Sequence, residues 1–273
     1  MSANREATGE AAPAPSGEST GGNARRWAVV SGASGAIGPA VVERLVGRGM
    51  GVVALARDPG RLDALSQTHG DALRAVAADV RDPDLGERLD GALGSGEVAM
   101  VVHMAAAPTA GGIMEAPFGA IESAFGVKVL GFLNLVRATR ARLGPHARLV
   151  AVGGNLAYDP VPDAAVSGIG NAALANVVRQ LQRAFAGTTV TCHMVAPGPV
   201  ATARFATLVE ATAAAGEISE EEAWAGALAA SPLRRLTTPE EVAWAIGLLA
   251  DSEAGALAGS TLLLDCGRRT GIP

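Results

Sequence analysis

Short apolar runs alternate along the chain with stretches in which apolar residues recur at helical spacing. Residues 52–56, VVALA, are apolar at every position, whereas residues 39–47 place Val41, Val42 and Leu45 on one side of a helix. Strands that are apolar on both faces are typical of a parallel sheet covered by helices on both sides. The pattern predicts seven strands, namely the run that opens residues 27–38 and residues 52–56, 73–78, 98–102, 148–152, 189–195 and 261–264.

The stretches between these runs predict helices. We expect them at residues 39–47, 61–67, 85–93, 116–143, 165–185 and 240–250. Residues 202–229 are helical in pattern and rich in alanine but contain no strand, which suits a mobile lobe beside the sheet. The regular alternation of strand and helix predicts an α/β protein.

Three glycines at intervals of three follow the first apolar run, in the segment SGASGAIG at residues 31–38. Gly32 allows the backbone to turn sharply, Gly35 leaves room for a pyrophosphate, and Gly38 lets the next helix pack closely on the sheet. The N-terminus of that helix then presents free N–H groups to the phosphates. Glycine turns also occur in ordinary loops, so a dinucleotide site is indicated only if other stretches of the chain agree with it. The expected fold is a Rossmann-like, doubly wound, seven-stranded parallel sheet.

Composition narrows the class of protein. The chain has 273 residues, of which 49% are hydrophobic and 18% charged, so one large core and one domain, residues 26–273, are expected. The net charge of -5 argues against nucleic acid or an anionic membrane as a partner. No apolar run approaches the roughly 18 residues that span a bilayer. Residues 1–25 lack an apolar core and predict a disordered tail, and Cys192 and Cys266 predict two reduced core thiols in a cytoplasmic protein.

Several stretches, in this order, resemble the short-chain dehydrogenase/reductase family over residues 27–267. They are SGASGAIG at 31–38, AADV at 77–80, VVHMAA at 101–106, VAPGPVAT at 195–202, PEEVA at 239–243 and GSTLLLDCG at 259–267, the last with Cys266 where the family usually has glycine. The resemblance implies a nicotinamide dinucleotide as cofactor, with the lobe at residues 202–229 above it. The cofactor-binding residues that it implies are Gly32, Ser34, Gly35, Ile37, Gly38, Arg57, Asp79, Val80, Ala105, Asn171, Pro197, Gly198 and Val200.

Arg57 follows the second expected strand, where an acidic residue would bind a ribose 2′-hydroxyl and a cation would bind a 2′-phosphate. A guanidinium binds phosphate in a bidentate way, so NADP(H) is favoured over NAD(H). We expect Arg57 to be the only cation near that phosphate. The alternative is a solvated loop charge without a ligand.

The residues that carry the family's reaction are replaced. The family uses a tyrosine as proton donor, a lysine that lowers the pKa of this tyrosine and holds the ribose, a serine, and an asparagine on the preceding helix. By the register of NAAL at 171–174 and GVKVLG at 126–131, the corresponding positions hold Ser167, Asn171, Gly154 and Lys128. A hydroxyl is a poorer acid than a phenol, and an amide carries no charge. The usual proton donation is therefore not expected.

The candidate catalytic residues are Lys128, Asn155, Tyr158, Ser167 and Asn171. Lys128 is the only lysine and lies on an apolar helix face, so it either holds the ribose or an oxyanion, or extends to the surface. Tyr158, the only tyrosine, is either a displaced acid or a packed loop residue. Asn155 and Ser167 can orient a substrate oxygen. His103 and His193 are expected to be satisfied core histidines at strand ends.

These features predict an atypical NADP(H)-dependent reductase of a small or polyketide-like carbonyl compound. The proton would come from water, Tyr158 or an acidic hydroxyl of the substrate. Alternatives are a non-redox cyclase, isomerase or dehydratase, or a nucleotide-binding protein without catalysis. The apolar surface of residues 116–143 predicts a homodimer or homotetramer. No metal site is expected.

Overall fold

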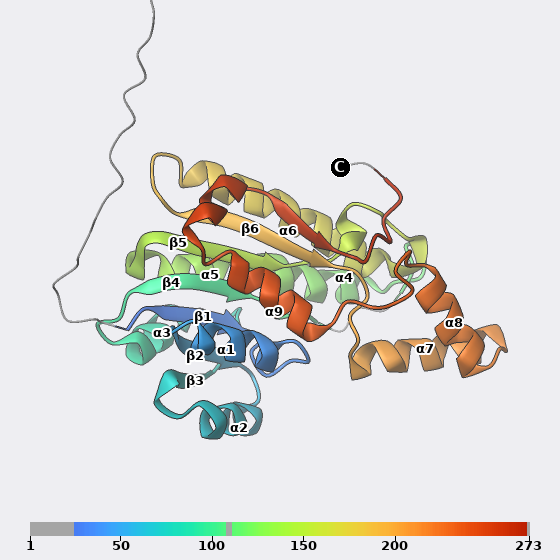
Figure 1. Cartoon of the computed structure of the whole chain (residues 1–273), viewed down its shortest axis with the longest axis horizontal. Helices are drawn as coiled ribbons and strands as arrows, with labels where there is room; N and C mark the ends of the chain where they lie inside the picture. Colours follow the sequence, from blue (N-terminus) through green and yellow to red (C-terminus); the bar gives the residue numbers. More distant parts are fainter. Residues whose placement is uncertain (1–24, 108–110, 272–273) are drawn as a thin grey trace, which may run out of the picture.

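The computed structural model describes residues 25–107 and 111–271, and in this part of the chain seven parallel strands form one sheet in the order β3-β2-β1-β4-β5-β6-β7 (Figure 1). The strands are β1 Trp27–Ser31, β2 Gly51–Ala56, β3 Leu73–Ala77, β4 Val98–His103, β5 Leu143–Val152, β6 Thr191–Pro197 and β7 Thr261–Leu264. Every residue of β1, β2, β4 and β6 is buried, as apolar runs between two helical layers require. The expected Rossmann-like fold is confirmed. Most of the expected tail lies outside the described residues.

Helices cover both faces of the sheet and bury two separate hydrophobic cores (Figure 1). On one face lie α1 Gly38–Gly47, α2 Pro59–His69 and α9 Pro239–Leu248. On the other lie α3 Leu85–Leu93, α5 Gly131–Thr139 and α6 Ala165–Ala184. Each helix buries the apolar stripe that its sequence spacing predicts, for example Leu85, Leu89 and Leu93 of α3.

The long helix expected at residues 116–143 is interrupted. α4 Phe118–Phe125 is followed by a π-helical segment, Gly126–Leu130, then by α5 and a short 3-10 turn, Arg140–Arg142. Together, residues 118–142 form a helix long and apolar enough to cross a membrane by length and composition, although Glu122, Lys128 and Arg137 divide it into shorter apolar runs. Phe132 and Leu135 are fully buried in the core, which accounts for the apolar character of α5 without a membrane.

The alanine-rich stretch at 202–229 forms two helices, α7 Ala203–Gly216 and α8 Glu220–Ala229, and contains no strand. The helices separate at Glu217, whose φ of 51° is left-handed, and Ser219 begins α8 with a capping box. Phe205 and Trp224 meet edge to face within a small apolar cluster of their own. We call residues 203–231 the lobe, which projects from the body in Figure 1.

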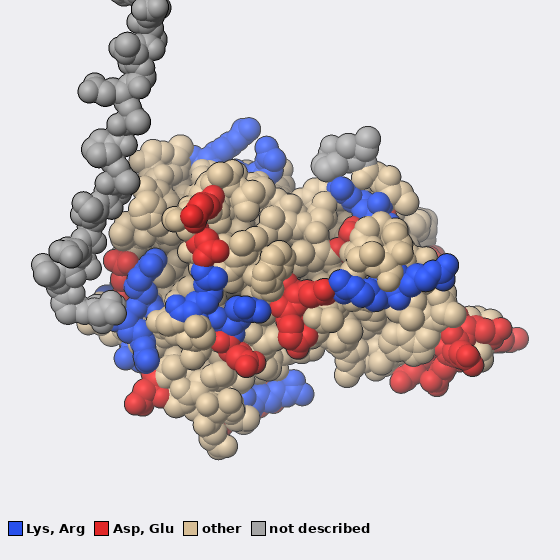
Figure 2. Space-filling model, viewed as in Figure 1, with Lys and Arg blue, Asp and Glu red and all other residues tan. Residues whose placement is uncertain are grey.

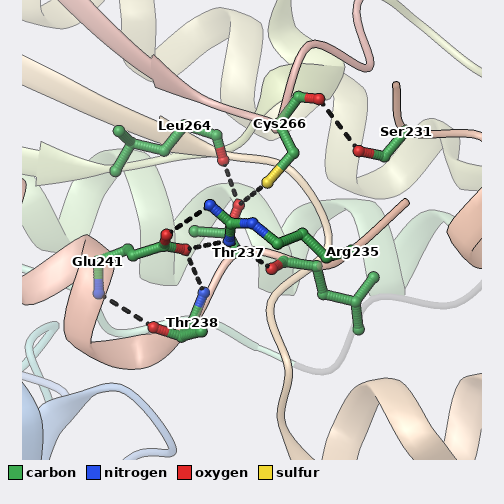
Figure 3. A network of polar contacts seen from close by, with 8 residues as sticks. Ser231, Arg235, Thr237, Thr238, Glu241, Leu264 and Cys266 are labelled. Carbon is green, nitrogen blue, oxygen red and sulfur yellow. Dashed lines mark hydrogen bonds and ion pairs between the residues drawn. The ribbon is translucent and has the colours of Figure 1, made fainter. Parts of the chain in front are cut away.

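The base of the lobe is fastened to the body by the polar contacts in Figure 3. Arg235 donates two hydrogen bonds to the carboxylate of Glu241, at 2.8 and 2.7 Å. Thr237 donates to the Leu264 carbonyl oxygen and pairs in parallel with Val200, so the two ends of the lobe lie side by side. Cys266 lies beside Thr237, half-buried at a φ of 55°, so the expectation of two core thiols holds for Cys192 alone.

Gly38 provides a test of the packing of α1 on the glycine turn. A Cβ built on Gly38 would lie 2.0 Å from the Ala33 carbonyl oxygen, whereas one built on Gly47, in the same helix, would meet nothing within 4 Å. Gly38→Ala should therefore lower the free energy of unfolding by about 1–3 kcal/mol. Gly47→Ala, the matched control, should raise it by about 0.5–1 kcal/mol. Urea unfolding measures both, and equal midpoints for the two variants would contradict the packing argument.

Candidate functional site

The glycine turn lies where the chain leaves β1, between β2 and β4. Gly32 has a φ of +77°, and a Cβ there would lie 2.8 Å from the Ala105 backbone nitrogen, so this position requires glycine. Gly35 is exposed, and α1 begins without a side-chain cap. The Gly38 N–H donates to the Gly35 carbonyl oxygen at 3.1 Å and Pro39 has no N–H, so the helix start offers an anion its positive dipole end more than free N–H groups. The turn therefore fits a pyrophosphate.

The ends of β2 and β3 carry charged groups at the same edge. Arg57 follows β2 and is exposed, and Asp79 lies just beyond β3. Arg81 binds the Asp79 carboxylate at 2.9 and 2.8 Å. Hydrogen bonds from Arg81, and the charges of Arg81 and Arg57, lower the pKa of Asp79. Arg81 is a second guanidinium at this edge, engaged by the Asp79 carboxylate, so the expectation that Arg57 is the only cation near a 2′-phosphate stays a prediction.

Lys128 lies at the centre of the π-helical segment and reaches α6. Its Nζ donates to Asn171 Oδ1 at 2.5 Å, and Asn171 is buried. Burial and the charge of Arg204 lower the pKa of Lys128 to about 8. Insertions of the π-helical type are frequent at functional sites. The structure thus brings together two of the candidate residues, 43 positions apart in the chain.

Gly154, in the loop after β5, lies close to both the Asn171 amide and the end of β6. A Cβ built on Gly154 would lie 2.8 Å from Asn171 Nδ2 and 3.6 Å from the Pro197 carbonyl oxygen. A side chain at position 154 therefore requires Asn171 to move. Asn155 is buried in the short turn that follows, and Ser167 is half-buried one helical turn before Asn171 on α6.

Tyr158 is not bonded to this pair. Its hydroxyl lies 2.5 Å from Thr261 Oγ1, on the edge strand β7, and the side chain is exposed. This contact fits the alternative of a packed loop residue better than that of a displaced acid.

The two core histidines are buried, but neither is fully satisfied. His103 Nδ1 lies 2.8 Å from Ser31 Oγ, while its buried Nε2 has no partner of full hydrogen-bond geometry among the described residues, although the Val127 and Lys128 backbone lies close to the ring. Burial, together with the charge of Lys128, lowers the pKa of His103 to about 3, so the ring is neutral. His193 lies inside β6, not at its end. Its Nε2 contacts Thr191 Oγ1, its Nδ1 has no partner of full hydrogen-bond geometry in residues 25–107 and 111–271, and burial lowers its pKa to about 4.

Sequence reasoning missed three features of the site, namely Arg81, Arg204 and the contact of Ser31 with His103. Arg204 is the second residue of α7, directly after the Pro-Gly loop. The sequence signals a role for Arg204 only through its position after that loop, because the direction in which α7 leaves the body depends on tertiary packing.

A glycine turn at the point where the strand order of a parallel sheet reverses defines a nucleotide-binding α/β protein of the Rossmann class. A family model described as "Enoyl-(Acyl carrier protein) reductase" matches residues 32–269. The chain belongs to the short-chain dehydrogenase/reductase family of oxidoreductases, which use nicotinamide cofactors.

Individual relatives are distant. The 2,3-dihydro-2,3-dihydroxybenzoate dehydrogenase of Bacillus subtilis is 25% identical over 258 residues, covering 90% of this chain and 96% of that protein. A short-chain type dehydrogenase/reductase of Sinorhizobium fredii is 26% identical over 89% of this chain, which spans 43% of that longer protein. The crystal structure of YwfH, an NADPH-dependent reductase involved in bacilysin biosynthesis, matches with a TM-score of 0.82 at 19% identity, covering 91% of this chain and 100% of that one. At this identity the likeness shows the fold.

The pKa of Lys128 predicts how its removal changes stability with pH. The folded value is about 8 and the ordinary value 10.5, so between these pH values the unfolded chain binds more protons and stability rises with pH. Below pH 8 the folded state carries the whole cost of the buried charge. Lys128→Met should therefore stabilise the fold at pH 7 by about 1–3 kcal/mol, and by less at pH 10. Urea unfolding at both values measures this, and a difference that does not change with pH would contradict it.

Proposed function

We propose that the protein is an NADP(H)-dependent reductase of a small or polyketide-like carbonyl compound, with an atypical catalytic centre. The observation that carries this proposal is the contact of Lys128 Nζ with Asn171 Oδ1. It supports a site that keeps a positive charge beside the position where the family has its lysine.

Lysine and asparagine have exchanged helices relative to the family pattern. Position 171 holds the amide and position 128 the ammonium, and their contact across the two helices keeps both groups together. Burial of an ammonium beside a neutral amide is unfavourable, so a chain without use for the charge gains nothing from it. Perturbed, buried ionisable groups of this kind are concentrated at functional sites.

Residues of the glycine turn and the strand ends would hold the cofactor. Gly32, Gly35 and the α1 N-terminus suit the pyrophosphate, Arg57 suits a 2′-phosphate, and the Asn171 amide can hydrogen-bond a ribose hydroxyl. When bound, the nicotinamide supplies the hydride.

The proton source differs from that of the family. Ser167 can orient a carbonyl oxygen but is a poor acid. The Lys128 ammonium, with a pKa of about 8, can stabilise negative charge that develops on this oxygen. The proton then comes from water or an acidic hydroxyl of the substrate, because the Tyr158 phenol is already bonded to Thr261.

Cofactor preference tests Arg57. NADPH should bind at least about tenfold tighter than NADH, because a guanidinium binds the 2′-phosphate and no carboxylate follows β2 directly. Arg57→Ala should remove most of this preference, whereas Arg61→Ala, an exposed arginine that already pairs with Asp58, should preserve it. Calorimetric titration measures all three proteins. Equal affinities for the two cofactors in the unmodified protein would refute the assignment.

Turnover tests the division of roles at the pair. Ser167→Ala should lower the rate of NADPH oxidation by less than about 100-fold, because the hydroxyl orients the oxygen and is not the proton donor. Lys128→Met should lower it more. The opposite order would make Ser167 the donor. Product formed at the same rate without NADP(H) would replace the redox reaction by a cyclisation, isomerisation or dehydration.

We also propose a homodimer or homotetramer in the cytoplasm. Large apolar side chains of α4, the π segment and α6 are exposed, namely Phe118, Phe125, Leu130 and Ile169. Both cysteines are free, as suits a reducing compartment. Light scattering at micromolar concentration should give an oligomer mass, and a monomer would refute this part of the proposal.

A further inference from the structure

A cavity of about 250 Å³ lies between the C-terminal half of α6 and the segment that leads into the edge strand β7. Its lining residues come from these two segments, namely Arg179, Gln182, Arg183, Ala258, Gly259 and Ser260. None of them belongs to the expected cofactor or catalytic residues. The volume is below the roughly 300–1,000 Å³ of sites for drug-sized ligands, so the cavity suits one small chemical group.

Both walls of this cavity are fixed to one residue of β6. Gln182 Oε1 accepts a hydrogen bond from the Cys192 N–H at 2.8 Å, and the Gly259 N–H donates to the Cys192 carbonyl oxygen at 2.8 Å. Gly259 has a φ of +76°, and a Cβ there would lie 3.4 Å from Gln182 Cγ. The cavity is therefore held open by packed structure on both sides.

All four polar side chains that line the cavity can donate hydrogen bonds, and none is acidic. Arg179 and Arg183 are exposed, and in the part of the chain that the structure describes neither forms a hydrogen bond or an ion pair. Because Gln182 Oε1 is bonded to the β6 backbone, the Nε2 donors of this amide are left for a ligand. Ser260 Oγ is buried and has no partner of full hydrogen-bond geometry among the described residues.

Acidic side chains around the cavity are absent or contact other groups. Residues 164–209, which include all of α6, contain no Asp or Glu. In the turn before the cavity segment, Asp251 pairs with Arg48, and the Glu253 carboxylate accepts a hydrogen bond from the adjacent serine hydroxyl at 2.8 Å. In Figure 2, basic side chains project from the upper edge of the body, where α6 lies in Figure 1, and acidic side chains gather at the outer end of the lobe.

From these donors we infer that the cavity is a second anion site, which binds the phosphate monoester group of a small soluble molecule. Arg179 and Arg183 lie one helical turn apart, and two guanidinium groups match the charge of about −1.5 to −2 and the three acceptor oxygens of such a phosphate. A carboxylate offers one charge and two oxygens. The helix dipole accounts for a cation in the last turn, where Arg183 lies, but not for Arg179 one turn earlier.

This site is remote from the glycine turn and from Asn171. Four steps between neighbouring strands separate β1 from β7, roughly 19 Å at about 4.8 Å per step, and Ser260 precedes the amino end of β7. Arg183 lies roughly 18 Å along α6 from Asn171, at about 1.5 Å per residue. The ligand therefore does not compete with the cofactor, and the inference does not rest on the proposed function.

Calorimetric titration with methyl phosphate tests the site, and methyl sulfate, a monoanion of the same shape, is the matched probe. At about pH 8, where the phosphate is a dianion, methyl phosphate should bind about tenfold tighter than methyl sulfate. Arg179→Gln and Arg183→Gln should each weaken the binding of methyl phosphate by about tenfold. Arg183→Lys should keep part of the affinity, because it keeps the charge but loses the planar fork.

Arg44→Gln is the control, because Arg44 is an exposed arginine of α1, which covers the other face of the sheet. It should leave the affinity unchanged, as should Arg57→Ala at the expected cofactor site. Equal affinity for the two probes, no measurable binding at millimolar concentration, or full binding in both Arg179→Gln and Arg183→Gln would overturn the inference. Binding that is lost in Arg57→Ala alone would place the probe in the cofactor site and overturn it as well.

Ser260→Ala provides a readout without ligand. Because it removes a buried hydroxyl that lacks a partner, it should raise the urea midpoint of the ligand-free protein while weakening methyl phosphate binding by about threefold. Unchanged affinity in this variant would place the anion outside the cavity and contradict the inference.

Vesicles of phosphatidylcholine and phosphatidic acid test the other source of a phosphate monoester, a lipid headgroup. They should not co-sediment with the protein, because its net charge of -5 disfavours an anionic surface. Co-sedimentation that Arg183→Gln abolishes would assign the site to a membrane and overturn the small soluble ligand.

Discussion

The parallel pairing of β1 with both β2 and β4 is the constraint on which the site depends. It brings the carboxyl ends of all strands to one edge and makes successive connections leave β1 in opposite directions. The Gly32 backbone packs directly against Ala105 beyond β4, which leaves space for a ligand only outside the strand ends. Arg57, Asp79 and Pro197 reach this edge because each ends or follows a strand.

Near that edge, the Lys128 ammonium is held by a hydrogen bond to a neutral amide and not by an ion pair. The side-chain oxygen of Asn171 accepts a hydrogen bond from one of the three N–H donors of the ammonium, and the π-helical segment positions the Lys128 side chain for this contact. The neutral ring of His103, whose pKa burial and the Lys128 charge lower, is stacked on Phe132 at 5.6 Å between ring centroids. Among residues 25–107 and 111–271, no acidic side chain forms an ion pair with this ammonium.

The sequence alone predicts the sheet well, because buried parallel strands must be apolar. Residues 85–93 and 261–264 match α3 and β7 at both ends. Gly32 could be placed because only glycine readily takes a φ of +77°. The π segment could not be predicted, because one added residue per turn hardly changes the spacing of the apolar residues. The contact of Lys128 with Asn171 and the orientation of the Arg204 side chain could not be predicted either, because both depend on how helices distant in the sequence pack.

The pairing of Val200 with Thr237 has a consequence for the diversity of related proteins. The chain enters and leaves the lobe at adjacent points, and the lobe has a small apolar core of its own. The lobe is therefore a long loop whose two ends lie side by side. The entropy of closing such a segment grows slowly with its length. Insertions, deletions or wholesale exchange between residues 203 and 231 therefore leave strand register and the glycine turn intact. Ligand recognition can diverge in this part of the molecule while its nucleotide-binding half stays the same.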